Sequence, residues 1–233
     1  MLLPAHPFSV RSQSRTVPAV VWLPAEPARG LVLALHGGSG HKESPAILAI
    51  RDELLPSGFA VAAIDGPVHG DRRSDGLRDP DAVKAAFREA WRDGVGQLDM
   101  AADLRAALDH LLALPELQGL PTGYIGVSMG TAYGLPFLAH EPRIKAAVIG
   151  LWSAGHVNSS HLAACAAQVS CPVWFTQQWD DQIFDRDATL ALFDAVGSAD
   201  KRLVAYPGPH RELEGGRLRD AADFLRSQLQ GAA

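Results

Sequence analysis

The stretch YIGVSMGTAYGLPF, residues 124–137, places a serine between two glycines where an apolar run changes into a helical pattern. A G-x-S-x-G pentapeptide also arises by chance in unrelated chains, so by itself it is only a hypothesis. Glycines beside a serine suit a sharp turn, because the backbone approaches its neighbours closely there. The meaning of the stretch therefore depends on what the rest of the sequence brings to the same place.

Short, fully apolar segments alternate with longer amphipathic ones along most of the chain. Continuous apolar strands indicate a parallel sheet covered on both faces, and their alternation with helices indicates the α/β class. Two early segments, 7–13 and 16–24, are expected to pair as strands joined near Ser14 and Arg15. The other expected strands lie within 31–38, 59–66, 122–128, 144–152, 171–177 and 201–208, and the expected helices are 42–56, 95–114, 187–196 and 216–229. The prediction is a mostly parallel twisted sheet of about eight strands with helices on both faces.

Composition narrows the class of protein further. The chain has 233 residues and is 47% apolar and 20% charged, which predicts one domain spanning residues 1–233. A net charge of −5 argues against a nucleic-acid partner. No run of 18 uncharged apolar residues exists, which predicts no membrane span. The first residues do not read as a secretory signal, so a cytoplasmic location is expected.

Cysteine and histidine usage predicts a protein without a metal. Cys165 and Cys171 are the two cysteines, and a pair of buried thiols in a reducing compartment is favoured over a disulfide. The histidines are scattered, and no cluster has the spacing of a structural zinc site. Neither a metal nor a cofactor is expected.

Residues 66–93 do not fit the alternation of strands and helices. They are rich in charge and carry no strand pattern. Because they follow a strand, they are expected to form an excursion over the carboxyl edge of the sheet, where ligands bind in α/β proteins. Two interpretations stay open: a solvated excursion with one surface helix, or a wall of a pocket.

Chemically useful side chains follow four of the predicted strands. His36 and a glycine loop follow the run 31–35, Ser128 follows the run 122–127, Asp180 and Asp181 follow the run 172–177, and His210 follows the run 202–206. A serine hydroxyl becomes nucleophilic when a base such as histidine accepts its proton, and a carboxylate fixes the histidine tautomer. The backbone N–H groups of Met129 and of the 37–39 loop would bind the oxyanion of a tetrahedral intermediate.

The motifs LHGGSGHKE, IDGPVHGDRR, GVSMG, WDDQIF and PGPH occur in an order and at intervals that resemble the α/β-hydrolase superfamily. The similarity extends over essentially the whole chain, and is to the small bacterial dienelactone-hydrolase-like and serine esterase branch. The resemblance implies Ser128 as the nucleophile, His210 as the base and an acid within WDDQIF. It also implies Gly38 as one oxyanion donor. Only about twenty residues separate Trp152 from Cys171, where the family inserts large lids, so no large cap domain is expected.

Two departures from the family pattern affect the prediction. Dienelactone hydrolases themselves use a cysteine nucleophile, so Ser128 argues against that particular reaction. The usual glycine before the acid is replaced by Gln177 and Gln178, which leaves the acid open between Asp180 and Asp181. The common form of the family motif favours Asp181.

Several other residues are candidates for supporting roles. Arg72 and its neighbour Arg73 would match a substrate carboxylate, although such pairs are usually solvated. Trp152 and Trp179, with Trp91 from the excursion, are candidates for an apolar pocket wall or for the core. The remaining assignments are structural: His36 shapes the oxyanion loop, His69 shapes its own loop or faces the substrate, Asp65 braces a turn, and His41, His140, His156 and His161 lie at the surface or at helix ends.

These residues together predict a serine hydrolase that cleaves carboxylic esters of short to medium acyl chain through an acyl-enzyme. The partner is a small-molecule ester, and the protein is expected to be a monomer or a homodimer. Amide, lactone or carbon–carbon bond hydrolysis on the same triad remains an alternative, because fold and triad do not separate these reactions. A ligand-binding receptor or sensor with slow or no turnover is the alternative outside the enzymes.

Overall fold

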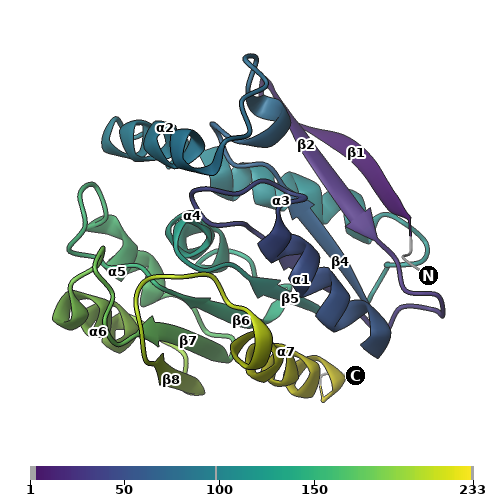
Figure 1. The fold of residues 1–233 in the computed structure, drawn as a ribbon. Helices are drawn as coiled ribbons and strands as arrows, with labels where there is room; N and C mark the ends of the chain where they lie inside the picture. Colours follow the sequence, from purple (N-terminus) through teal and green to yellow (C-terminus); the bar gives the residue numbers. More distant parts are fainter. Residues whose placement is uncertain (1–3, 98, 232–233) are drawn as a thin grey trace.

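The computed structural model describes residues 4–97 and 99–231. Its strands form one sheet of eight, in the order β1-β2-β4-β3-β5-β6-β7-β8 (Figure 1). The strands are β1 (Ala5–Ser12), β2 (Arg15–Trp22), β3 (Gly30–Ala34), β4 (Phe59–Ile64), β5 (Thr122–Ile125), β6 (Ile144–Gly150), β7 (Val173–Gln178) and β8 (Lys201–Tyr206).

The sheet is mixed, with parallel pairing in its larger part. The hairpin β1–β2 and the pair β2–β4 are antiparallel, whereas β4, β3, β5, β6, β7 and β8 pair in parallel. All residues of the central strands β3 and β4 are buried, as strands covered on both faces require. The prediction of a mostly parallel α/β sheet of about eight strands is confirmed.

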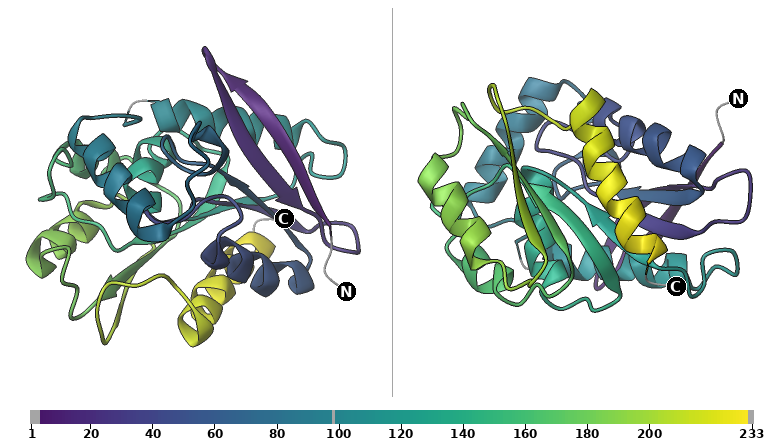
Figure 2. Two further views of the ribbon diagram at one scale, coloured as in Figure 1. Left: turned by 45° about the horizontal axis from the view of Figure 1, so that its top comes forward. Right: turned by 90° about the horizontal axis from the view of Figure 1, so that it is seen from below.

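Helices cover both faces of the sheet, as predicted. In the described residues the α-helices are α1 (Pro45–Leu54), α2 (Pro80–Arg92), α3 (Asp99–Leu112), α4 (Met129–Leu138), α5 (His161–Ala166), α6 (Arg186–Ala195) and α7 (Gly215–Gln230), with short 3-10 turns at η1 (Leu55–Ser57) and η2 (Gly70–Arg72). Helices α1 and α7 lie side by side on one face, as the view from below in Figure 2 shows, and their apolar residues share one core layer. Helices α3, α4 and α5 pack in sequence over the other face.

Two strands end earlier than the apolar pattern suggested, and this leaves room for the loops that follow them. β3 stops at Ala34 and β5 at Ile125, so the glycines at 37–38 and at 126 belong to turns rather than to strands. Between β6 and β7 the chain forms only α5, and no large cap domain is present among the described residues. No helix in the described ranges is both long and apolar enough to cross a membrane.

The two cysteines depart from the predicted burial. Cys165 and Cys171 are free thiols, as favoured over a disulfide, but both are partly exposed rather than fully buried. Cys165 lies on the short helix α5 and Cys171 in the turn before β7, near the protein surface in both cases.

Candidate active site

The turn between β5 and α4 holds Ser128 in a strained conformation. Its backbone has φ 57° and ψ −120°, outside the regions that residues other than glycine usually occupy. The two flanking glycines are required by close contacts. A Cβ on Gly130 would lie 2.7 Å from the carbonyl oxygen of Leu35, and one on Gly126 would lie 2.7 Å from the Tyr124 hydroxyl. The glycines therefore allow β5 and α4 to meet at an angle that exposes Ser128 at the edge of the sheet.

Buried hydroxyl groups hold this turn in place. The Thr131 hydroxyl lies 3.1 Å from the carbonyl oxygen of Gly126, 2.5 Å from that of Gly150, and 2.7 Å from the Gly150 N–H that it accepts. Tyr124 donates its hydroxyl to the carbonyl of Gly130 at 2.6 Å. The bonds to Gly150 fix the turn against β6, the other two close the turn on itself, and burial shields all of them from water.

His210 lies between Ser128 and a carboxylate. Its Nε2 is 3.1 Å from Ser128 Oγ, and its Nδ1 is 2.8 Å from Asp181 Oδ2. Asp181 comes from the loop after β7, and His210 from the loop after β8. Parallel strands of one sheet thus bring three residues that are distant in the sequence to its carboxyl edge.

The structure brings Asp181, not Asp180, to His210. Asp181 Oδ1 accepts the backbone N–H groups of Ile183 at 2.8 Å and Phe184 at 3.1 Å, which turns Oδ2 toward the histidine. Asp180 points the other way and accepts the N–H of Gly208 at 3.0 Å. Of the two carboxylates that the sequence left open, Asp181 is therefore the one in position to orient the imidazole.

The surroundings of Asp181 favour its charged form. Burial raises the pKa of this carboxyl, but the hydrogen bond and the charge of His210, together with two backbone N–H groups, outweigh burial and lower the pKa below its usual value. The carboxylate stays ionised at neutral pH. It therefore accepts the Nδ1 proton of His210 and leaves Nε2 free to accept a proton from Ser128.

The backbone N–H groups of Gly38 and Met129 are candidate donors near Ser128. In the described parts of the chain neither donates a hydrogen bond to a protein group. Met129 begins α4, so its N–H is one of the unpaired donors of a helix N-terminus. A Cβ on Gly38 would meet the Phe87 ring at 2.6 Å, so only glycine fits between the loop and α2.

His36 fixes the peptide that carries the Gly38 N–H. Its Nε2 accepts the N–H of Gly66 at 3.1 Å, so the ring proton lies on Nδ1 and is donated to the carbonyl of Gly37 at 2.7 Å. Because C=O and N–H point in opposite directions in a trans peptide, this bond turns the Gly38 N–H away from His36. Burial and the neighbouring His69 lower the pKa of His36, so the ring stays neutral.

His69 contacts the next carbonyl of the same loop. It is fully buried, and its Nε2 donates to the carbonyl of Gly38 at 3.1 Å. Burial lowers its pKa to about 4, which keeps it neutral at physiological pH. The sequence left two roles open for His69, shaping a loop or facing the substrate. In the structure the ring contacts a loop and does not line the cavity at Ser128.

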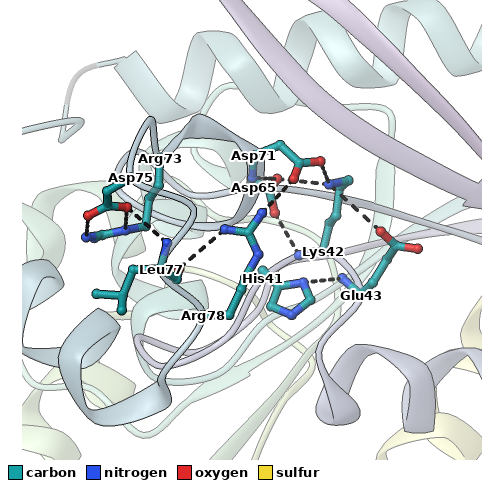
Figure 3. Close-up of polar contacts among 9 residues, drawn as sticks. All are labelled: His41, Lys42, Glu43, Asp65, Asp71, Arg73, Asp75, Leu77 and Arg78. Carbon is teal, nitrogen blue, oxygen red and sulfur yellow. Dashed lines mark hydrogen bonds and ion pairs between the residues drawn. The ribbon is translucent and has the colours of Figure 1, made fainter.

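A partly buried charge cluster ties the loop after β3 to the segment after β4 (Figure 3). Asp65 accepts the Lys42 backbone N–H at 2.9 Å, the Lys42 Nζ at 3.1 Å and the Asp71 N–H at 2.8 Å. Lys42 also reaches the Asp71 carboxylate, which Arg78 contacts at 2.8 Å from its other side. Burial lowers the pKa of Lys42, but its bonds to the two carboxylates outweigh this and raise it. Asp65 therefore braces two loops together.

A cavity of about 150 Å³ opens beside Ser128 and His210. One wall is aromatic, with Phe87 from α2, Trp152 after β6, and Phe184 after β7. The rest of the lining is largely polar, with Lys84 and Arg88 from α2 and Arg211 and Glu212 after His210. The cavity thus pairs an apolar surface with several charged groups around one serine.

Three of the residues proposed for the pocket lie elsewhere, and these assignments need correction. Trp179 does not line the cavity; it is 47% exposed, with its ring under the Arg186 guanidinium at 4.1 Å. Arg72 does not line the cavity either, and one of its guanidinium nitrogens pairs with the buried Asp103 at 2.7 Å. Trp91 belongs to the core and donates its indole N–H to the carbonyl of Val157 at 2.7 Å.

The sequence analysis misplaced one residue of the cavity, His156, and did not consider another, Glu212. His156, expected at the surface, packs edge-on against Trp152 and Phe184 and lines the cavity. Glu212 was not considered, although its position two residues after His210 was a usable signal. In the described residues no three histidine, cysteine, aspartate or glutamate side chains gather in a way that would hold a metal ion.

Comparison with known proteins identifies the family through solved structures. No protein-family model matches the chain, and no curated protein matches it. A cold-adapted esterase from an Arctic intertidal metagenomic library is 38% identical with a TM-score of 0.86, and the match covers 97% of this chain and 94% of that one. At this identity over nearly the full length of both chains, the chain belongs to the α/β-hydrolase family, in its dienelactone-hydrolase-like esterase branch.

More distant structures share the fold alone. The dienelactone hydrolase from Anabaena variabilis is 21% identical with a TM-score of 0.69, and the match covers 98% of this chain and 97% of that one. The 2,6-dihydroxy-pseudo-oxynicotine hydrolase is 20% identical with a TM-score of 0.78, and the match covers 98% of this chain and 69% of that one.

Proposed function

We propose that this α/β-hydrolase is a serine carboxylesterase, with Ser128, His210 and Asp181 as its catalytic triad. The observation that carries the proposal is the continuous contact from Ser128 Oγ through the two ring nitrogens of His210 to Asp181, at 3.1 Å and 2.8 Å, at the mouth of a cavity. The esterase at 38% identity supports ester substrates. The proposal names a serine as the nucleophile, in place of the cysteine of dienelactone hydrolases.

The reaction proceeds through an acyl-enzyme. Ser128 attacks the ester carbonyl while His210 Nε2 takes the hydroxyl proton, and Asp181 stabilises the imidazolium that results. The N–H groups of Gly38 and Met129 hold the oxyanion of the tetrahedral intermediate. The alcohol leaves with the proton from His210. A water molecule then attacks the acyl-enzyme, with His210 again as the base, and releases the acid.

The size and lining of the cavity favour short to medium acyl chains. About 150 Å³ accommodates a short chain, and the aromatic wall of Phe87, Trp152 and Phe184 offers it an apolar surface. We propose that residues 66–93 act as a wall of this pocket, because Phe87 and two basic residues of α2 line it. The protein is further proposed to act in the cytoplasm as a monomer or homodimer. Size-exclusion chromatography tests the oligomeric state.

Hydrolysis of p-nitrophenyl esters with acyl chains of two to twelve carbons tests the proposal. The wild type is expected to be most active on the shorter chains, and Ser128→Ala to lose all activity above background. Activity that persists in Ser128→Ala overturns the serine mechanism. A wild type that turns over none of these esters favours amide, lactone or carbon–carbon substrates, or a receptor with slow turnover. Slow single turnover with tight retention of the ligand favours the receptor.

A further inference from the structure

Glu212 is an ionisable group of the cavity that the triad mechanism does not use. It lies two residues beyond His210 in the loop between β8 and α7, and it lines the same cavity as Ser128. In the described part of the chain its carboxyl group forms no hydrogen bond and no ion pair. A partly buried carboxyl group without a protein partner is uncommon, because burial removes the water that would otherwise bind it.

The position of this carboxyl group depends on a glycine in the oxyanion loop. A Cβ on Gly37 would lie 1.9 Å from Glu212 Oε1, so the carboxyl group occupies the space of the missing Gly37 side chain. The next residue is Gly38, whose N–H is the proposed oxyanion donor. Glu212 therefore lies beside the place where negative charge develops on the substrate.

The charge on Glu212 changes the electrostatic stabilisation of the oxyanion. An ionised carboxylate beside the loop repels the developing oxyanion, and the repulsion is stronger in a partly water-excluded site than in bulk water. A protonated carboxyl group removes this repulsion and supplies an O–H donor instead. We propose that Glu212 is a substrate-contacting residue of the active site, and that its carboxyl group is protonated when Ser128 reacts at its full rate. The inference rests on the proposed serine mechanism.

The surroundings of Glu212 bring the pKa of its carboxyl group into the pH range of an ordinary enzyme assay. Burial raises its pKa to about 6, while the positive charges of His210 and Lys84 act to lower it. The carboxyl group is thus mostly protonated below about pH 6 and ionised above it. The other charged or titratable groups that face the cavity are Arg88 of α2, His156 before α5, and Arg211 of the same loop.

The pH dependence follows from two groups with opposite requirements. His210 accepts the serine proton only in its neutral form, so acid is expected to suppress the reaction. Glu212 is favourable only when protonated, so reactivity falls as pH rises through the titration of this carboxyl group. The wild type is expected to show a maximum, and a variant with a permanently neutral side chain at 212 is expected to reach a plateau.

Labelling of Ser128 by a fluorophosphonate probe tests the inference, because the probe needs no knowledge of the natural substrate. Rates are measured between about pH 5 and pH 9 for the wild type, Glu212→Gln and Glu214→Gln. Glu214 is the matched control: it is exposed, lies two residues further on, and pairs with Arg211 at 3.0 Å. At pH 8 the Glu212→Gln variant is expected to react about tenfold faster than the wild type, and the control at the wild-type rate.

The outcomes separate this inference from the proposed function. Superimposable pH profiles for the wild type and Glu212→Gln overturn the role of Glu212 while leaving the serine mechanism intact. A Glu212→Gln variant that is slower at every pH also overturns it, because the carboxylate then assists His210. No labelling in any variant overturns the serine mechanism, and the inference with it.

Urea unfolding gives a second readout. Glu212→Gln is expected to raise the unfolding midpoint at pH 8 but not at pH 5, since a raised carboxyl pKa destabilises the fold only where the group ionises.

Discussion

The change Asp181→Asn is expected to remove nearly all activity, because the two carboxylate oxygens have different partners. Oδ1 accepts two backbone N–H groups, from Ile183 and Phe184, whereas Oδ2 faces Nδ1 of His210 at 2.8 Å. An asparagine keeps its oxygen toward the two backbone donors, so its NH₂ group faces the histidine. Nδ1 must then accept, and the ring proton moves to Nε2, which points at Ser128.

With its proton on Nε2, His210 cannot accept the proton of Ser128. A histidine held in the wrong tautomer lowers kcat by about 10³- to 10⁴-fold, or roughly 4 to 5.5 kcal/mol of transition-state stabilisation. Asp180→Asn is the matched control. Its side chain accepts only the Gly208 N–H, which an amide oxygen also accepts, so a loss of less than about fivefold is expected.

The assay is kcat for hydrolysis of p-nitrophenyl butyrate at about pH 8. Urea unfolding runs in parallel, because Asn keeps both backbone contacts of position 181 and the variant is expected to unfold at nearly the wild-type midpoint. An Asp181→Asn variant that retains more than about a tenth of the wild-type kcat refutes the tautomer reasoning. A larger loss in Asp180→Asn than in Asp181→Asn refutes the choice of the acid.

Three further predictions follow from contacts around the site. Thr131→Val keeps the shape of the side chain but leaves buried backbone groups without their partner, so urea unfolding is expected to show a loss of about 2 to 4 kcal/mol, whereas Thr131→Ser stays within about 1 kcal/mol. Lys42→Met leaves the buried Asp65 carboxylate without its cation, and a loss of about 3 kcal/mol is expected by the same method; an unchanged midpoint contradicts a bracing role. Trp152→Ala is expected to change KM for butyrate esters at least about threefold, and Trp179→Ala less than about twofold. Equal effects contradict the conclusion that Trp152 lines the cavity and Trp179 does not.

Much of the fold was predictable because its signals are local. The apolar runs of the central strands, the glycines around Ser128 and the turn residues after each strand lie within a few positions of one another. Their order predicts a mostly parallel sheet with its chemistry at the carboxyl edge. The ends of the strands were predicted less accurately, since the apolar pattern continues through Val127 although β5 ends at Ile125.

The wrongly placed site residues depend on contacts that no local pattern encodes. Arg72 looks solvated in its charged segment, but Asp103, which lies 31 positions away, binds it in the interior. Trp179 follows a strand that leads to the site, yet the chain turns sharply enough to leave its ring outside under Arg186. His156 lies in an irregular segment, and its packing against Trp152 and Phe184 places it at the cavity.

The chain order of the three triad candidates has a consequence for how activity arises during synthesis. Ser128 and His210 are 82 positions apart, and Asp181 lies between them. A nascent chain that has released β5 and α4 already contains the turn with Ser128, but it lacks Asp181 and His210 until β7 and β8 have emerged. Domains generally fold as units during synthesis, with earlier segments first. The onset of Ser128 reactivity in a translation or refolding time course therefore reports the completion of the sheet, and not its beginning.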